Sequence, residues 1–459
     1  MFILNNQQDN RQKTNLILLL TAVFSAFGLG AIIGYFANYF RQLWGRPGLH
    51  MRLLPQSPEE LLPEAGKALH IAANNVRSGV ELRHLPDGTR KFVLNAGWRN
   101  FREPWARDFG FASFGLMVLD EVQVLKDGLE LFLHFQQENG RFPVKIHSTS
   151  VLDRYIHSLF GRQQPIHSPL KPKYQTAHNT VSYDGNALIV IAALNYLRQY
   201  DDEIFASTYW ENLKQAVRWL ENEARDDTGL LYQEAYTDWA DSIIRKGHIH
   251  YTNILYWKAI HELARDAEKY EFAEDAAYFS QKAEKLKQTI QDYFWNKELG
   301  FFSTSHKFAD ILSSDGNLLA IAWGLATPEQ ANSIFSKMEQ FGMGDPVPTK
   351  PTNKSYGRSN IAIENRLGGI GHYHISAAWL WLGSWHVIAL TRSGRLEEAK
   401  IHLDRMRHVI LRDGVVHEVY DIDGTFLKTR WYESEAPLTW SASLFIYAHS
   451  VYQHALDDI

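Results

Sequence analysis

The chain has 459 residues, 45% of them hydrophobic and 22% charged, with a formal net charge of −5. This length allows one large domain or two to three ordinary ones, and the weakly acidic balance, without a Lys/Arg block, gives no reason to expect a nucleic-acid partner. The absence of cysteine excludes disulfides, thiolate metal sites and cysteine nucleophiles. Aromatic residues make up 13% of the chain. Such a content suits either an aromatic core or surfaces for ring-shaped ligands such as sugars.

The N-terminal part of the sequence indicates a membrane anchor. Residues 1–14 are polar, and we expect them to be disordered. Residues 15–40 contain no charged side chain and are long enough to cross a bilayer as a helix, so we predict an uncleaved, single-pass anchor, with a cleaved signal peptide as the alternative. Gly30 and Gly34 form a small-xxx-small pair that would let two anchors pack as a homodimer. One more basic residue follows the predicted anchor than precedes it, which favours a cytoplasmic C-terminal domain. Because the difference is a single residue, the side of the membrane on which that domain lies stays open.

The rest of the sequence predicts a helical domain. Residues 41–57 are expected to form a linker, and helical periodicity with turn-rich breaks continues over residues 58–459. Twelve helices without a short repeat suit a closed double ring of six inner and six outer helices, an all-α (α/α)6 barrel, rather than a solenoid. Strand-like runs are short, as at Lys91–Leu94 and Val415–Tyr420. The predicted helices are 58–77, 107–119, 121–137, 182–199, 205–225, 251–269, 273–294, 315–324, 328–341, 375–393, 396–411 and 437–456.

Two carboxylates near the middle of the chain are candidates for acid–base chemistry. In the stretch Tyr236–Ser242, Asp238 and Asp241 flank Trp239. A carboxyl group beside a large aromatic ring can have its pKa raised by desolvation, which suits it to act as a general acid. The alternative is that Asp238 caps the following helix and Asp241 is a solvated first-turn acid. On these residues alone the two aspartates are not ranked.

Other polar and aromatic residues also gather in loops and at helix starts, where a scaffold usually presents function. Arg107 and Asp108 are adjacent at a helix start, where they would either grip neighbouring sugar hydroxyls or serve as a surface Arg and a cap. The loop 138–181 is long for a compact domain, so we expect it to form a lid or a wall of a pocket. Two further segments in which polar and aromatic residues gather are Gly371–His386 and His417–Ser441.

Several classes of site are absent from the sequence. The pairs His248-x-His250 and His372-x-His374 are isolated, and no helical metal-binding motif accompanies them. There is no phosphate-binding P-loop, dinucleotide fingerprint or nucleophile elbow. We therefore expect no metal and no cofactor. Carboxylates, histidines and tryptophans around a helical ring indicate glycoside hydrolysis, which needs only two carboxylates and aromatic walls.

Taken together, these segments resemble the inverting glycoside hydrolases that have an (α/α)6 barrel. That clan includes neutral/alkaline invertases, glucoamylases, processing α-glucosidases and the amylo-α-1,6-glucosidase type of debranching enzyme. The resemblance extends from about Trp98 to Tyr452, and five short motifs follow the order of the clan. They are Trp105–Phe109, Val181–Gly185, Trp239–Ser242, Gly371–Trp385 and His417–Asp421.

The resemblance implies a role for each segment. Asp241 would be the general acid, with Asp238 as runner-up, and Glu418 the general base, acting on an α-glucosidic bond of sucrose, an α-glucan or an oligosaccharide. Ser242 stands where invertases have Arg, and Trp239 is closer to the debranching pattern, so the subfamily stays open. The expected substrate contacts are Trp105, Arg107, Asp108, Tyr183, Asp184, Asp238, Trp239, His372, His374 and Trp440.

Two other functions remain open from the sequence. N-acyl sugar 2-epimerases resemble the same helical ring and use histidine as acid and base, a role that His248, His372 and His374 would then fill. The second alternative is a non-catalytic, membrane-anchored protein that binds sugars.

Overall fold

The computed structural model describes residues 64–458, apart from residues 151, 154, 155, 158, 159, 161, 167, 168, 225 and 271. The chain divides into two units, Met1–Leu61 and Leu62–Ile459, and every described residue belongs to the second. The predicted N-terminal segment 1–14, anchor 15–40 and linker 41–57 lie outside the described residues. Within the described residues, we find no helix with the length and apolar character that crossing a membrane requires.

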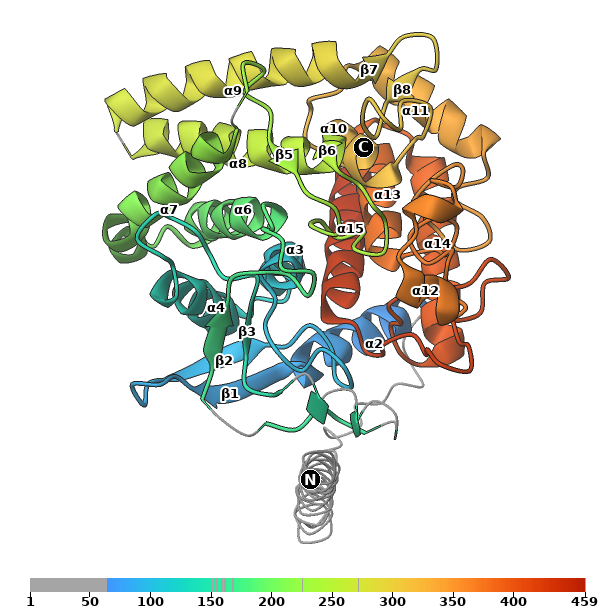
Figure 1. Ribbon diagram of the computed structural model, residues 1–459, viewed down its shortest axis with the longest axis horizontal. Coiled ribbons are helices and arrows are strands. Elements are labelled where there is room, and N and C mark those ends of the chain that lie inside the picture. Colours follow the sequence, from blue (N-terminus) through green and yellow to red (C-terminus); the bar gives the residue numbers. More distant parts are fainter. Residues whose placement is uncertain are drawn as a thin grey trace, which may run out of the picture. The chain divides into compact units, whose positions relative to one another are not determined.

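Inner helices form a closed ring in which each helix packs against the next, and the last packs against the first (Figure 1). These helices are buried on most sides, because each packs between two ring neighbours. In ring order they are α3 (Ala106–Val118), α6 (Asp184–Tyr200), α8 (His250–Lys269), α10 (Ser314–Ala322), α13 (Leu380–Arg392) and α15 (Thr439–Asp457).

Outer helices bury only one face, as their amphipathic sequences predict. Each of α4, α7, α9, α11 and α14 follows its inner partner after a short turn, and α2 packs on α15, so that the two ends of the described chain close the ring. The predicted all-helical ring of six hairpins is confirmed. The outer helices are α2 (Glu64–Ser78), α4 (Val122–His134), α7 (Glu203–Glu223), α9 (Ala273–Phe294), α11 (Pro328–Gln340) and α14 (Leu396–Asp413).

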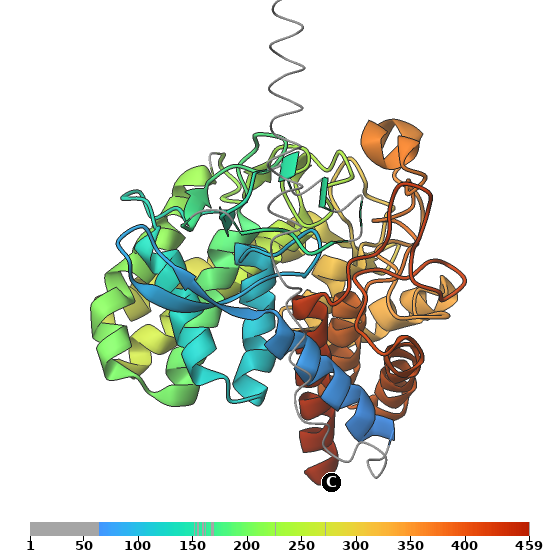
Figure 2. The ribbon, with the colours of Figure 1, turned by 90° about the horizontal axis from the view of Figure 1, so that it is seen from below.

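The connections that lead into the inner helices all lie at one end of the ring. They are long, and they pair with one another through isolated bridges such as Gly97↔Leu438, Ile243↔Ile361 and Ala378↔Tyr420. Figure 2 shows these connections gathered on one side of the helices. We call this side the loop face. Because every inner helix begins here, the loop face receives the positive ends of six helix dipoles.

Short strands and short helical segments occur within these connections. They are β1 (Val80–His84), β2 (Arg90–Leu94), β3 (Lys145–His147), β4 (Lys171–Lys173), β5 (Tyr232–Gln233), β6 (Gly247–His248), β7 (Trp295–Asn296), β8 (Phe301–Phe302), the 3₁₀ turn Arg358–Asn360 and α12 (Ile363–Leu367). The strands pair as antiparallel hairpins β1–β2, β3–β4, β5–β6 and β7–β8. The predicted strand at Lys91–Leu94 is confirmed as part of β2.

A predicted strand and a predicted helix start are wrong, both because loops on the loop face pair with one another. The segment Val415–Tyr420 is not a strand, because its backbone groups bond to different neighbours in turn: Val416 to Leu438, Val419 to Leu427 and Tyr420 to Ala378. The helix predicted to start at residue 375 starts at Leu380, because the residues before it are taken up by the same loop-to-loop pairing.

The closest approach between α3 and α15 requires a glycine. A Cβ atom on Gly115 would lie 2.1 Å from the backbone oxygen of Ser443. We expect Gly115→Ala to destabilise the protein by about 1–3 kcal/mol, because overpacking against backbone outweighs the gain of roughly 1 kcal/mol in helix propensity. Chemical denaturation measures this difference. The exposed Ser207→Ala on α7 serves as the control, and a Gly115→Ala protein as stable as that control would contradict the close packing.

Candidate active site

Asp241 lies on the loop face, in the connection between α7 and α8. Its side chain is open to solvent, yet the surrounding protein atoms raise the pKa of its carboxyl to about 7. Water therefore reaches the side chain of Asp241, while enough protein surrounds the carboxyl to disfavour its charged form. The negative charges of Asp238, Glu418 and Asp184 add to the rise in pKa, and Arg107 opposes it. This is the environment of a carboxyl that stays partly protonated at neutral pH.

Glu418 comes from the connection between α14 and α15, and its negative charge contributes to the raised pKa of Asp241. Its carboxylate is only 6% exposed and accepts hydrogen bonds from the hydroxyls of Tyr373 (2.6 Å) and Tyr432 (2.7 Å) and from the backbone N–H of Glu435 (3.2 Å). Burial raises its pKa, and the two tyrosine hydroxyls counter part of that rise because they stabilise the ionised form. Glu418 is thus held in one orientation as a hydrogen-bond acceptor.

The first turns of α3 and α6 bring charged groups to the same place. Arg107 donates from Nε to Asp184 at 2.5 Å, and the Ser182 hydroxyl also donates to Asp184 at 2.5 Å. Asp108, beside Arg107, has its pKa raised to about 7 by burial, with Glu418 and Asp184 adding to the rise. Carboxylates are favoured in the first turn of a helix by its dipole. The predicted pair Arg107–Asp108 therefore lies within electrostatic range of Glu418.

Asp238, the second aspartate of the central stretch, is 2% exposed and faces inward. It accepts hydrogen bonds from Gln233 (2.7 Å), Arg245 (3.0 Å) and the backbone N–H of Ala240 (2.9 Å). The same Arg245 donates to Asp315 at 2.9 Å. The contacts of Asp238 are internal, so its position does not fit the predicted contact with sugar. Asp238 therefore differs from Asp241, whose side chain is exposed to solvent.

The remaining predicted residues fall into two groups. Trp105 and His372 are partly open to solvent, and His372 lies 3.0 Å from the Asp421 carboxylate. His374 is buried; its ring stacks on Trp379 with centroids 5.2 Å apart, its Nδ1 lies 2.7 Å from the Ser242 hydroxyl, and burial lowers its pKa well below the usual range. The buried aromatic residues that lie beneath the loop face are Tyr183, Trp239 and Trp440.

The sequence did not single out four residues that hold Glu418 and the segment that carries Asp241. Tyr373 and Tyr432 lie in segments already noted for their aromatic residues, but nothing in the sequence paired them with Glu418. Arg245 follows Asp241 by four positions, and Asp315 lies at the start of a predicted helix. Neither position in the sequence indicates that the two side chains form an ion pair. Their pairing across 70 positions is visible only in the folded chain.

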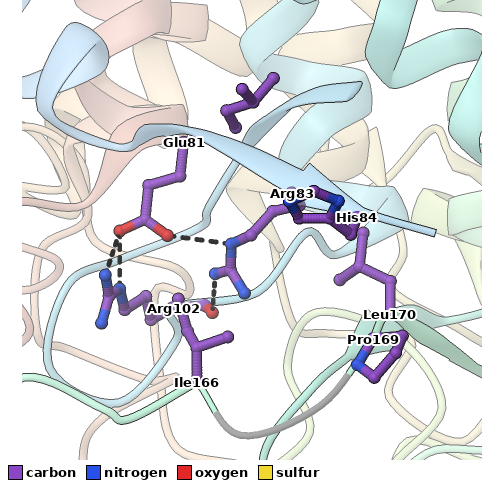
Figure 3. A pocket seen from close by; sticks show the side chains of 8 residues that line it. Glu81, Arg83, His84, Arg102, Ile166, Pro169 and Leu170 are labelled. Carbon is purple, nitrogen blue, oxygen red and sulfur yellow. Dashed lines mark hydrogen bonds and ion pairs between the residues drawn. The ribbon is translucent and has the colours of Figure 1, made fainter. Parts of the chain in front are cut away.

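A cavity of about 630 Å³ is lined by residues other than these carboxyls (Figure 3). It is lined by β1 residues together with Arg102, Ile166, Pro169 and Leu170. Figure 3 shows Glu81 between the two guanidinium groups of Arg83 and Arg102. Its charged groups are therefore already paired with one another, and it is not the candidate active site. Within the described residues, no group of three or more His, Asp or Glu side chains is arranged to hold a metal ion.

Comparison with known proteins places this fold among glycosidases. No curated protein matches the sequence. Among solved structures, a rhamnosidase from Klebsiella oxytoca with rhamnose bound superposes with a TM-score of 0.61 at 14% identity, over 85% of this chain and 64% of that one. The chain thus spans under two thirds of the length of that rhamnosidase.

Two further solved structures share the fold. A GH63 mannosylglycerate hydrolase from Thermus thermophilus, in complex with Tris and D-glycerate, has a TM-score of 0.60 at 15% identity, over 84% of this chain and 99% of that one. A GH78 rhamnosidase of a Bacillus species has a TM-score of 0.57 at 16% identity, over 84% of this chain and 35% of that one.

A family model described as the bacterial alpha-L-rhamnosidase six-hairpin glycosidase domain matches residues 102–341, more than half of the sequence. This range includes Asp241 and the helices from α3 to α11. The predicted resemblance to the six-hairpin glycosidases is confirmed, and the chain belongs to the family of bacterial α-L-rhamnosidase six-hairpin glycosidase domains.

Proposed function

We propose that the protein hydrolyses an α-glycosidic bond with inversion of configuration, with Asp241 as the general acid and Glu418 as the general base. One observation carries the proposal. Two carboxyls from different loops influence each other electrostatically, yet their surroundings differ. Asp241 accepts no hydrogen bond from any described residue, whereas Glu418 accepts three. Environments that distinguish two carboxyls in this way are typical of an acid–base pair.

The proposed reaction is a single displacement. Asp241 gives its proton to the glycosidic oxygen as the bond from that oxygen to the anomeric carbon breaks. Glu418 takes a proton from a water molecule that attacks the anomeric carbon from the opposite face. An inverting pair needs about 6.5–9.5 Å between its carboxyls to leave room for that water. Glu418, fixed by Tyr373 and Tyr432, would hold the water in line.

We assign the sugar contacts to the groups that solvent reaches. Arg107 and Asp108 offer a guanidinium and a carboxyl at the start of α3, and His372 offers a ring nitrogen beside Asp421. Trp105 offers an aromatic face for the apolar side of a sugar ring. The buried members of the predicted set, including Asp184 and His374, would act through the residues they hold.

The glycone is proposed to be a neutral sugar. Asp108, Asp184, Asp241 and Glu418 outnumber the guanidinium groups of Arg107 and Arg99 that act on them, and such an excess of carboxyls disfavours an anionic sugar. The sequence resemblance favours α-D-glucosides of the debranching, α-glucosidase or invertase type. The family and two of its solved relatives are described as rhamnosidases, which favours α-L-rhamnosides. A panel of α-glucosides, sucrose, α-L-rhamnosides and α-mannosides decides between them.

The histidine-based alternative, a sugar 2-epimerase, is less favoured by the geometry. His374 is buried and neutral, with one nitrogen at the Ser242 hydroxyl, and His248 lies 2.8 Å from Asp226 at the edge of the domain. Of the three histidines, His372 has the side chain that is most open to solvent. A non-catalytic sugar-binding protein would bind members of the panel without releasing product.

Replacing either proposed catalytic carboxyl should abolish most activity while the fold is retained. We expect Asp241→Asn and Glu418→Gln each to lower kcat by about 10²–10⁴-fold, the range that general acid–base catalysis contributes. Steady-state kinetics on the substrate found by the panel measures this loss. Asp227→Asn, exposed in the same connection as Asp241, is the control. Full activity in Asp241→Asn together with loss of activity in Asp238→Asn would show that the general acid is Asp238 and that our assignment of Asp241 is wrong.

The pH dependence of kcat/KM should report the raised pKa of Asp241. The proposed acid must be protonated, and its pKa of about 7 means that activity is retained below that value and lost as pH rises through it. We expect the alkaline limb to fall about tenfold per pH unit above roughly pH 7. A limb near pH 4, the ordinary range of aspartate, would show that Asp241 is not the essential acid.

A further inference from the structure

An aromatic pair joins the segment that carries Asp241 to the long loop that precedes α6. The rings of His178 and Tyr236 are stacked, with centroids 4.3 Å apart and planes 25° apart. His178 comes from the long loop that precedes α6, and Tyr236 opens the segment Tyr236–Arg245, which we call the acid loop. The two side chains are partly open to solvent. The hydroxyl of Tyr236 has no hydrogen-bond partner among the described residues.

The backbone of Tyr236 is in a conformation that few large residues adopt. Its φ is +61°, in the left-handed region, which costs a residue other than glycine about 1–3 kcal/mol. The Thr180 hydroxyl donates to the carbonyl of Tyr236 at 3.4 Å, and the stack on His178 adds to this support. This strained position carries a large aromatic side chain that stacks on His178, although an asparagine or a glycine would adopt the backbone conformation more easily.

A chain of contacts places this pair on the side of the acid. The backbone carbonyl of Ser242, directly after Asp241, accepts from the N–H of Ala362 at 2.8 Å. Ala362 leads into α12, whose Glu364 lies 3.7 Å from Nε2 of His178. Figure 2 shows α12, in orange, standing out from the body of the loop face. The acid loop, α12 and His178 are therefore joined by contacts that begin at the residue next to Asp241.

The base is held from other segments. Glu418 contacts Tyr373, Tyr432 and the backbone of Glu435. In an inverting reaction the acid protonates the oxygen that departs with the leaving group, and the base acts on the opposite face. Residues that lie near the acid but not near the base therefore face the leaving group, and residues near the base face the attacking water.

We propose that His178 and Tyr236 form the subsite for the leaving group, and that this subsite takes a sugar or another polyhydroxylated ring. The face of the aromatic pair would cover the apolar side of that ring, and the free Tyr236 hydroxyl and the His178 ring nitrogens would meet its hydroxyl groups. The inference rests on the proposed function, since it uses Asp241 as the acid.

The test compares two substrates that share a glycone. The first is the disaccharide or oligosaccharide found by the panel, and the second is the glycosyl fluoride of the same sugar, whose leaving group has no ring. Tyr236→Asn removes the aromatic ring and suits the left-handed backbone, because asparagine tolerates positive φ, so the variant should fold as well as the native protein. We expect it to lose about tenfold or more in kcat/KM on the oligosaccharide and to be unchanged on the fluoride.

Two further variants sharpen the comparison. His178→Ala should show the same selective loss. Tyr232→Asn is the matched control, because Tyr232 lies in the same connection as Tyr236 and is 45% exposed. Its ring also packs on a histidine, His248, with ring centroids 5.4 Å apart. It should leave both substrates unaffected.

Each outcome has a distinct meaning. An equal loss on both substrates, or no loss on either, overturns the leaving-group subsite while leaving the proposed function intact. If the native protein hydrolyses neither the fluoride nor any member of the panel, the proposed function fails and this inference fails with it.

Discussion

A buried guanidinium, that of Arg245, holds the acid loop against the inner ring. It is 1% exposed and donates both to Asp238 in its own loop and to Asp315 in the first turn of α10. The indole N–H of Trp239 donates to Asp315 as well, at 2.5 Å. A buried cation is tolerated only when it is paired, and its loss would leave two uncompensated carboxylates at a cost of about 3–5 kcal/mol. The position of Asp241 therefore depends on this ion-pair network.

The same network contributes to the chemistry of Asp241. Two carboxylates share one cation below the acid loop, and the negative charge of Asp238 is one of the influences that raise the pKa of Asp241. At the proposed base, the hydroxyls of Tyr373 and Tyr432 favour the ionised form of Glu418. Beyond Glu418 lies Glu435, fully buried, whose carboxylate accepts from the backbone N–H groups of Trp98 and Asn100. The proposed acid and base are thus each supported by buried polar groups that solvent does not reach.

The sequence predicts the scaffold well and the supporting contacts poorly, and the reason is physical. Helix periodicity and capping are local, so twelve helices and their approximate ends follow from spacing, as does the proline-led start of α11. Arg107, Asp108, Asp241 and Glu418 stand out because charged residues cluster at helix starts and loops. The ion pair of Arg245 with Asp315 and the stack of His178 on Tyr236 join segments far apart in the chain. No local pattern marks such partners, because packing of the ring decides them.

The central claim is that Asp241 and Glu418 act as an inverting pair, and the stereochemistry of hydrolysis tests it most directly. Proton NMR, recorded during the first minutes of hydrolysis of an α-glycoside, identifies the anomer of the released sugar before mutarotation mixes the two forms. The account predicts that the β-anomer appears first. Initial release of the α-anomer would show retention of configuration and would contradict the single-displacement mechanism.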